Sequence, residues 1–456
     1  MLFKNEESNK VNATVELYSL ASSDGLRNGQ AGNFKDPKWQ YLGIATENIE
    51  YSTLNPNGTS NWIYRWDETQ NATSCWAEKL TSNSTLSAWI GYCLAQETAT
   101  TYNYSGTLNN SDHTYQLTYT SEEGYSDDRG NNLIANSYTA PIDITTLNDA
   151  NFQNAKANIY IYKTGSYLEW KEQTTSEGFN AGQVIVIPVN TISTLGSEYP
   201  RTIASMQAFF VNATAEGASF SVNYENNVYN SLRKENQKRS KSLETESDFN
   251  VLKIQITSET SNDRLYLLEH AATSVEFDNG YDAEKIFDNP NGPQIYATLP
   301  WGYTSINSDA SFDGQVVGFR GSSDTELYTM TFDIDKLHSY DELYIYDTET
   351  ELYVDIFEAE AYQFYGSTIP NDSRFIVTST RQDASDSGDV TTGIEPNTKW
   401  NNLLQQNQPI AIYTTTGQLI ALFEANTFNP TNNKTELPTG IYIVKSGDFV
   451  IKINIQ

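Results

Sequence analysis

The sequence predicts an all-β protein built from tandem β-sandwich modules of a jelly-roll or immunoglobulin-like type. Three observations lead to this prediction. The chain is rich in strand-forming aromatic residues, with 30 Tyr, 19 Phe and 8 Trp. Apolar and polar residues alternate with period two in many short segments, and long helical periodicity is absent. Asn, Ser and Gly separate these segments and supply turns, as in two sheets joined by Greek-key connections.

The length of 456 residues corresponds to about three domains at roughly 150 residues each. We expect a large β-sandwich module over residues 1–230 and a second over 249–381. Between them, residues 231–248 are basic and almost free of apolar side chains, which is typical of a linker. An acidic linker at 382–397 precedes a small immunoglobulin-like C-terminal domain at 398–456.

The clearest strands are short segments in which apolar and polar side chains alternate or which consist largely of β-branched and aromatic residues. In chain order they are Asn61–Trp66, Asn158–Tyr162, Val184–Ile187, Leu252–Ile256 and Phe449–Ile455. We expect a short helix within residues 145–157, with a threonine as its N-terminal cap.

The net charge is −30, from 58 acidic and 28 basic residues. A field of this sign repels phosphate backbones and anionic lipids, so it argues against nucleic acid and membrane surfaces as partners. It is typical of a protein that stays soluble outside the cell or at its surface. A sharper alternative is that acidic loops collect calcium. The region from Trp400 onwards holds three acids and three lysines, and this neutrality indicates a separate module.

The chain has no run of about 18 apolar residues, so we expect no transmembrane segment. Its start also shows no signal peptide, because Met1–Phe3 lead directly into charged residues. We therefore expect that an export signal has been removed, or that the chain is a fragment with an added start.

Cys75 and Cys93 are the two cysteines. In a secreted chain, two thiols at this spacing predict a disulfide, which in the chain-entropy model contributes about 3 kcal/mol of stability. The alternative is a pair of buried thiols. Neither cysteine belongs to a CxxC pattern, so we expect no metal there.

The sequence lacks the motifs of common enzymes. Its three histidines are His113, His270 and His338, and none lies in a HExxH pattern. No GxSxG elbow and no nucleotide-binding glycine loop is present. We therefore expect no enzyme activity, no catalytic residues and no cofactor. A glycosidase stays open as an alternative, because its two carboxylates need not be close in sequence.

One acidic loop is a candidate calcium site. Glu276, Asp278, Asp282 and Glu284 surround Gly280, and alternating oxygen ligands around a glycine turn suit a calcium ion. The structural alternative is that Asp282 caps a short helix over residues 283–287. Because the twelve-residue EF-hand order is missing, we favour the cap and predict no metal. Asp309, Asp313 and Gly314 form a weaker version of the same pattern.

Five tryptophans gather near the start of the chain. They are Trp39, Trp62, Trp66, Trp76 and Trp89. Exposed tryptophans stack on the faces of sugars, whereas buried ones fill the core of a sandwich. We expect burial. A row of exposed aromatic rings would instead favour a carbohydrate-binding module.

The last forty-odd residues contain short strands separated by Gly-containing turns. The residues of this pattern are Gly417, Leu437, Pro438, Gly440 and Tyr442. This order of strands and turns resembles the C-terminal sorting domain of cargo proteins of the type IX secretion system of Gram-negative bacteria. The resemblance implies that the domain contacts the secretion machinery and serves export and attachment.

The resemblance to type IX cargo extends over most of the chain, in collinear segments. These are Gly130–Asp143, Gln207–Ala213, Phe277–Lys285 and Tyr344–Thr348. It implies an adhesin-like surface protein. We therefore expect a non-enzymatic protein that is secreted or displayed on the outer cell surface and that binds a neutral glycan or a host protein. The alternatives are a carbohydrate-binding module and the accessory C-terminal half of a larger secreted enzyme.

Overall fold

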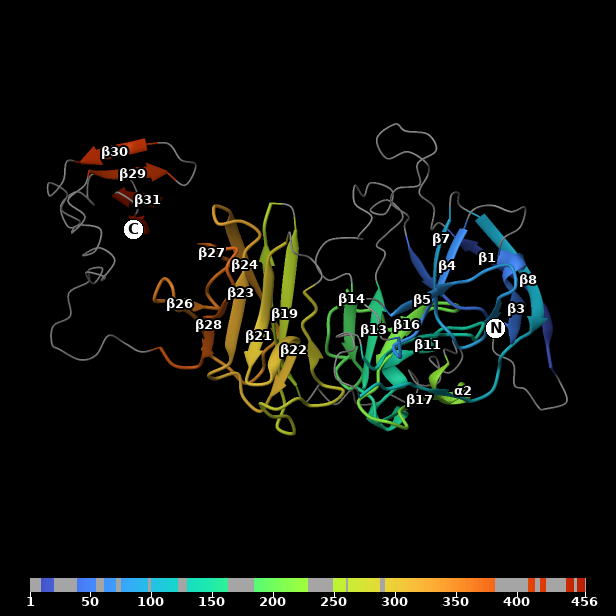
Figure 1. Cartoon of the computed structure of the whole chain (residues 1–456). Coiled ribbons are helices and arrows are strands. Elements are labelled where there is room, and N and C mark those ends of the chain that lie inside the picture. The colour runs from blue at the N-terminus through green and yellow to red at the C-terminus, as the bar shows by residue number, and fades with distance from the viewer. Residues whose placement is uncertain are drawn as a thin grey trace, which may run out of the picture. The chain divides into compact units, whose positions relative to one another are not determined.

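The protein is described here by a computed structural model, and its fold is all-β, as the sequence predicts (Figure 1). It divides into two compact units, residues 1–381 and 382–456. The structure describes residues 10–19, 39–54, 61–70, 75–96, 100–121, 129–162, 184–228, 249–259, 261–287, 292–381, 409–414, 419–423, 440–446 and 449–455. Both predicted linkers, 231–248 and 382–397, lie outside these ranges.

The first strands form three small antiparallel sheets. In spatial order they are β1 (Asn12–Ser19) with β8 (Thr100–Thr107); β2 (Gln40–Leu42), β7 (Tyr92–Gln96), β4 (Asn61–Trp66) and β5 (Trp76–Lys79); and β3 (Asn48–Glu50) with β6 (Thr85–Ser87). A 3-10 helix, η1 (Tyr51–Leu54), follows β3. Apolar side chains between these sheets form one core, which includes Leu42, Ile63, Leu94 and Tyr102.

The next strands form three further antiparallel sheets. They are β10 (Asn131–Ala135), β16 (Ala208–Asn212), β13 (Asn158–Tyr162) and β14 (Val184–Pro188); β11 (Ile142–Asp143) with β15 (Thr202–Ile203); and β12 (Phe152–Gln153), β17 (Ser219–Val222) and β9 (His113–Gln116). The helix expected within residues 145–157 is instead two 3-10 turns, η3 (Ile144–Thr146) and η4 (Asp149–Asn151), capped by Asp143 and Asn148. A four-residue helix, α2 (Tyr224–Asn227), follows β17.

One large sheet of eleven strands occupies residues 250–378. Its spatial order is β26 (Leu352–Asp355), β25 (Tyr344–Asp347), β28 (Asn371–Thr378), β23 (Val316–Arg320), β21 (Gln294–Leu299), β22 (Gly302–Asp309), β19 (Asn262–Glu269), β18 (Asn250–Thr257), β24 (Leu327–Lys336) and β27 (Tyr362–Tyr365), with β20 (Ala283–Glu284) paired to β22. The sheet curls so that β27, at one end, contacts β25, which is next to the other end. The Tyr362 hydroxyl on β27 donates to Asp347 on β25 at 2.7 Å.

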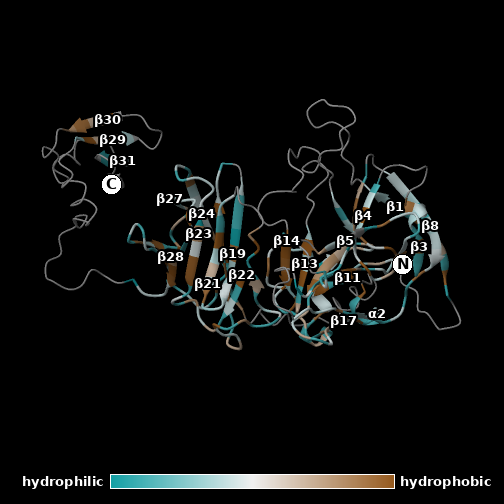
Figure 2. Cartoon of the chain, in the orientation of Figure 1, coloured by the Kyte–Doolittle hydropathy of each residue, from teal (hydrophilic) through white to brown (hydrophobic). Residues whose placement is uncertain are grey.

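Apolar side chains of this unit form two more cores. Figure 2 shows in brown the strands β13 and β21, which contribute to them. The core of the curled sheet contains Ile254, Phe319 and Phe375. The largest core packs β13, β14 and β16 together with Tyr266 and Ile306 of the large sheet. The apolar interior therefore continues between the two regions that the sequence predicts as separate modules, and the division at 230/249 stays a prediction.

The C-terminal unit is a four-stranded antiparallel sheet. Its order is β30 (Leu419–Phe423), β29 (Ile410–Thr414), β31 (Gly440–Ser446) and β32 (Phe449–Ile455). The alternating segment at the very end of the chain is thus a strand, as expected. On β29 and β31, Ile410, Ile412 and Val444 are buried, which gives this unit an apolar centre of its own.

A buried ion pair holds the closure of the large sheet. Arg374 on β28 is 2% exposed, and its guanidinium lies 3.4 Å from Asp347, which is fully buried, and 2.9 Å from Glu349. The same guanidinium lies 4.4 Å from the ring centre of Phe364 on β27. Strands from both ends of the sheet therefore meet at one cation.

We expect Asp347→Ala to lower the free energy of unfolding by about 3–5 kcal/mol, because it leaves a buried guanidinium without its buried counter-charge. Urea unfolding followed by tryptophan fluorescence measures the change. Glu358→Ala removes a carboxylate from an exposed site and is expected to change stability by less than about 0.5 kcal/mol. Equal effects of the two substitutions would contradict the role of the pair.

Candidate functional site

The sheet of β2, β7, β4 and β5 has two different faces. Along β4, Asn61 and Ile63 are buried, whereas Trp62, Tyr64 and Trp66 alternate with them and are half-buried. Because side chains of a strand alternate between the two faces, these three rings share the face opposite Ile63. On that face Trp66 packs against a second apolar cluster, which consists of Leu133, Ala135 and Ala208.

Neighbouring strands add aromatic rings to the same face. Trp76 on β5 pairs directly with Trp66, and their ring centres are 5.0 Å apart. Tyr41 on β2 lies 5.6 Å from Trp76. Trp39 lies 5.7 Å from Tyr64. We call the six half-buried residues the aromatic face; they are Trp39, Tyr41, Trp62, Tyr64, Trp66 and Trp76.

Two rings of the adjacent sheet extend the aromatic face. Tyr162 on β13 stacks on Tyr41 with ring centres 4.8 Å apart, and Phe210 on β16 meets Trp66 edge to face at 5.0 Å. The Trp66 indole also donates to the Asn131 carbonyl at 2.5 Å. The rings are therefore held in fixed orientations by strands from two sheets.

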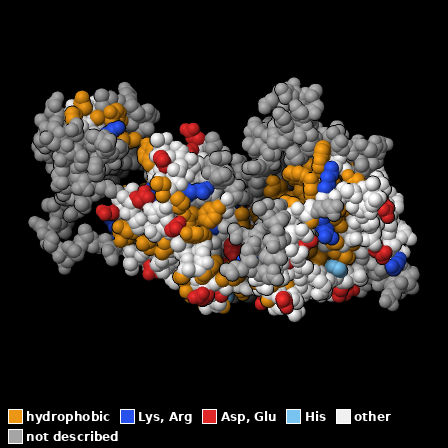
Figure 3. Space-filling view, in the orientation of Figure 1, with side chains coloured by type: hydrophobic (Ala, Val, Ile, Leu, Met, Phe, Trp, Pro, Cys, Tyr) orange, Lys and Arg blue, Asp and Glu red, His pale blue; other side chains and the backbone are white. Residues whose placement is uncertain are grey.

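The aromatic face also carries a cation. The ammonium of Lys79 on β5 lies 5.1 Å from the ring centre of Trp62. Figure 3 shows orange apolar side chains and blue basic ones together over the region of β4 and β5. Rings with π faces and a nearby ammonium suit a ligand that offers C–H groups and hydroxyls.

Four of the five tryptophans singled out in the sequence thus lie on one face, half-buried rather than buried as expected. The fifth, Trp89, is elsewhere. It has a backbone φ of 69° and stacks on His113 with ring centres 3.9 Å apart. Its amide donates to the Ser137 hydroxyl at 2.8 Å. Tyr41 was missed in the sequence because the pairing of β2 with its neighbours is long-range, whereas Tyr64 could have been found from its alternation with Trp62 and Trp66.

Cys75 and Cys93 are not joined by a disulfide in the structure, contrary to the sequence-based expectation. Cys93 on β7 pairs with Tyr64 on β4, and Cys75 lies beyond β4, next to Trp76. The strand β4 therefore separates them, which places them about 10 Å apart across the sheet, and more along it. A disulfide needs a Cα separation below about 7 Å. Both cysteines are buried, and burial raises the pKa of the Cys93 thiol well above its ordinary value.

The carboxylates of the acidic loop around Gly280 do not converge on one point, as a calcium site would require. They bind groups in two regions of the fold instead. The Asp282 carboxylate accepts hydrogen bonds from the amides of Asp278 and Ser308, at 2.8 and 2.7 Å. Glu284 pairs instead with Lys156. Burial raises the pKa of Asp282 to about 7. Asp282 does not cap a helix: Ala283 and Glu284 form β20, because pairing with β22 overrides the local helical preference.

The described residues contain no group of three or more His, Cys, Asp or Glu side chains that is arranged to hold a metal ion. Within those same ranges, no helix has both the length and the apolar character needed to cross a membrane.

Three of the five residues of the sorting pattern, Gly417, Leu437 and Pro438, lie outside the described residues. Gly440 begins β31, and Tyr442 on the same strand is buried and pairs with Thr414 and Ile453. The turn-to-strand step in this pattern therefore leads into a central strand of the C-terminal sheet. Its role in sorting stays a prediction.

The chain belongs to a family described as a domain of unknown function (DUF8693), whose family model matches residues 27–378. It is 28% identical over 351 residues to the minor fimbrium subunit Mfa5 of Porphyromonas gingivalis (strain ATCC 33277). The match covers 73% of this chain and 27% of that relative, so the chain spans about a quarter of the relative's length. No solved structure matches the chain.

We expect the pH dependence of stability to include His113. Burial lowers the pKa of His113 in the folded state to about 4, against an ordinary value of 6.5. The unfolded chain therefore binds a proton first as the pH falls, and the contribution of His113 to stability is lost between about pH 6.5 and 4.

His113→Phe keeps an aromatic ring against Trp89 but cannot titrate. Urea unfolding at several pH values is expected to show that the wild type loses more stability than this variant between about pH 6.5 and 4. The matched control is the same substitution at His338, which is exposed. Parallel pH curves for wild type and His113→Phe would contradict the prediction.

Proposed function

We propose that this protein is a non-enzymatic, surface-displayed adhesin-like subunit that binds a neutral glycan through the aromatic face. The observation that carries the proposal is the placement of six half-buried aromatic rings on one face of a sheet whose other face supplies a core. Three of them, Tyr41, Trp66 and Trp76, also pack against a second apolar cluster, so the proposal assigns the ligand chiefly to the other three. Rings that only filled an interior would be buried on both sides.

The charge of the protein supports a neutral ligand. With a net charge of −30, the protein repels polyanions such as nucleic acid and heparin at moderate salt. An uncharged sugar presents a C–H face to a ring and hydroxyls to polar neighbours, so it gains contacts without crossing an unfavourable field. A host protein surface is the other partner that the same rings suit, because aromatic residues are enriched at protein interfaces.

The curated relative supports a place at the cell surface, since its name is that of a fimbrium subunit. A fimbrium is a surface assembly, and an adhesive, non-enzymatic role agrees with such a setting. The lack of recognisable catalytic motifs in the sequence agrees with the same role. The alternative of an accessory region of a larger secreted enzyme is tested by the sequence that precedes this region in its gene.

The C-terminal unit is proposed to direct type IX export and attachment. The support is the resemblance of residues 410–455 to sorting domains, together with the neutrality of the region from Trp400 onwards beside a strongly acidic remainder. A separate compact sheet suits a module that is recognised by itself. Its partner is then the secretion machinery.

Trp62→Ala and Tyr64→Ala are expected to weaken binding of a neutral polysaccharide about tenfold or more, because each removes a ring of the aromatic face. The measurement is isothermal titration calorimetry with ligands first identified on a panel of neutral polysaccharides and extracellular-matrix proteins. The matched control is Tyr365→Ala, which removes a 49% exposed ring from the large sheet.

The same panel distinguishes the alternatives. Binding only to a matrix protein, lost in Trp62→Ala, would replace the glycan by a protein partner. Release of reducing sugar by the purified protein would overturn the non-enzymatic reading. Equal binding by Trp62→Ala, Tyr365→Ala and the wild type would place the site elsewhere.

Residues 395–456 fused to a periplasmic reporter are expected to carry the reporter to the surface of a type IX-competent host. Fractionation and protease accessibility of the reporter measure the outcome. A tail taken from a known cargo of that host serves as the positive control. Retention of the fusion in the periplasm, while the control is exported, would rule out the sorting role.

A further inference from the structure

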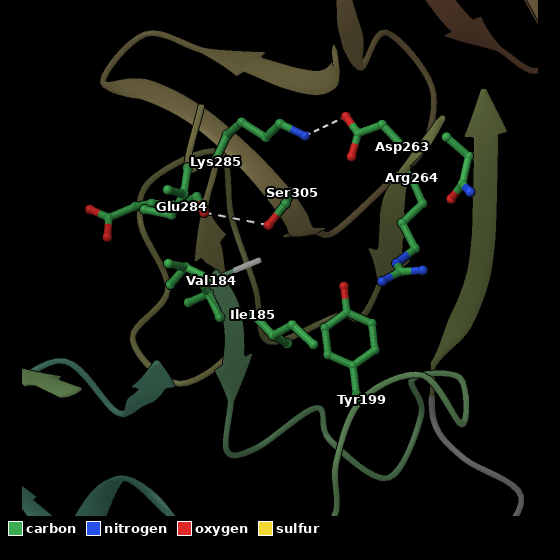
Figure 4. A pocket seen from close by; sticks show the side chains of 11 residues that line it. Val184, Ile185, Tyr199, Asp263, Arg264, Glu284, Lys285 and Ser305 are labelled. Atoms are coloured by element: carbon green, nitrogen blue, oxygen red, sulfur yellow. Dashed lines mark hydrogen bonds and ion pairs between the residues drawn. The ribbon is translucent and has the colours of Figure 1, made fainter. Parts of the chain in front are cut away.

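A small cavity lies where β14 approaches β19 and β20, away from the aromatic face. It has a volume of about 50 Å³. Figure 4 shows Val184 and Ile185 of β14 on one side, with Arg264 of β19 and Tyr199 opposite them and the Lys285–Asp263 pair beyond. Its walls therefore come from separate stretches of the chain, namely residues 184–186 with Tyr199, residues 262–264, and residues 284–286 with Ser305.

Most charges around this cavity are already neutralised. Asp263 is paired with Lys285, and both side chains are almost fully buried. Glu284 is paired with Lys156 and also accepts from the Tyr160 hydroxyl at 3.2 Å. In Figure 4 the Glu284 carboxylate points away from the cavity.

The next carboxylate along the junction is also occupied. Glu198 accepts from the Lys253 ammonium at 2.7 Å and from the Tyr266 hydroxyl at 2.5 Å. These bonds hold the pKa of Glu198 at about 2 despite its partial burial. Each of the three carboxylates nearest the cavity thus has its own lysine.

Arg264 lines the cavity and has no such counter-charge. Within the described residues it makes no ion pair with a carboxylate, and its guanidinium lies 5.8 Å from the ring centre of Tyr199. Arg201 nearby donates to the Leu195 carbonyl at 2.7 Å, and its other terminal nitrogen is buried without a hydrogen-bond partner. In a protein with a net charge of −30, this small region carries an excess of positive charge.

Tyr199 adds a second donor. Its side chain is 6% exposed, and burial raises its pKa to about 12, so the phenol keeps its proton at neutral pH. Its O–H is therefore available as a donor to a group in the cavity that Tyr199 lines. Figure 4 shows this hydroxyl directed into the cavity beside the guanidinium.

We infer that this cavity binds a carboxylate group, held by the guanidinium of Arg264 and the hydroxyl of Tyr199. A carboxylate supplies a counter-charge for Arg264 and an acceptor for the hydroxyl of Tyr199. Its planar pair of oxygens matches the fork of a guanidinium, which forms short, charge-assisted bonds. Val184 and Ile185 provide an apolar wall for the carbon atoms that follow the carboxylate.

The volume limits what enters. About 50 Å³ accommodates only a small group, such as the three heavy atoms of a carboxylate. The carboxylate end of a small organic acid fits, and so does the carboxylate of an acidic sugar whose ring stays outside. This site is separate from the aromatic face, and the inference does not depend on the proposed binding of neutral glycans.

The experiment is calorimetric titration of the full chain with sodium acetate, D-glucuronate and N-acetylneuraminate, at constant ionic strength set with sodium chloride. Glucose and N-acetylglucosamine serve as uncharged comparisons. Arg264→Gln is expected to weaken carboxylate binding about tenfold or more, and Tyr199→Phe to weaken it less. Arg381→Gln removes the same charge from an exposed site and is expected to bind as the wild type does. Thermal unfolding checks that each variant is folded.

Each outcome decides the proposal. Binding of acetate alone supports a small organic acid, whereas tighter binding of glucuronate or N-acetylneuraminate supports an acidic sugar. No binding of any carboxylate, or equal binding by folded Arg264→Gln and the wild type, would overturn the site. The site would also be overturned if chloride or inorganic phosphate competed as effectively as acetate does. The pocket would then bind any small anion rather than select a carboxylate. Loss of neutral-glycan binding in Trp62→Ala leaves these results unchanged.

Discussion

The first unit depends on the pairing of charges in the interior between β13–β14 and the large sheet. A charge buried without a partner costs several kcal/mol, so apolar packing between these strands is tolerated only where each ion has a counter-ion. Lys156 with Glu284 and Lys253 with Glu198 meet this condition across the junction, and Lys285 with Asp263 meets it within the large sheet. The side-chain amide of Asn158 adds a contact across the junction by donating to the Asp282 carbonyl at 2.9 Å. Because the first two pairs each join one region to the other, they contribute to the alignment of the two regions as well as to their stability.

The two proposed sites, the junction cavity and the aromatic face, differ in the kind of surface that they offer. At the junction each described carboxylate has its own lysine, and Arg264, which has no described carboxylate, marks a place where an external anion is proposed to bind. On the sheet of β2, β7, β4 and β5, by contrast, alternation sends the apolar residues of β4 into the core and its aromatic residues outward. The first site recognises charge in a confined space, and the second recognises shape and C–H surface over a broad area.

Much of the fold follows from local pattern, whereas the sites depend on pairing between distant segments. The alternation of Trp62, Tyr64 and Trp66 is visible in the sequence and places three rings on one face. That Tyr41 and Trp76 join them follows only from the register of β2 and β5, which no local signal encodes. The expected disulfide was wrong for the same reason, since spacing along the chain says nothing of the strand that intervenes. The expected cap at Asp282 was wrong because cross-strand pairing outweighed local helix preference.

Acidic and basic side chains differ in where they lie in the structure. Most carboxylates of the described residues are exposed. They repel one another and any polyanion, which favours solubility and disfavours binding of negatively charged polymers. The few basic residues are not spread evenly to balance them. Several are concentrated in the interior of the first unit, where Arg374 closes the large sheet and Arg264 faces the cavity. A single carboxylate entering that cavity is shielded from the outer field by the surrounding strands, and it meets a guanidinium at close range, where the interaction is strongest. An overall negative charge and a specific site for an acid group are therefore compatible in the same chain.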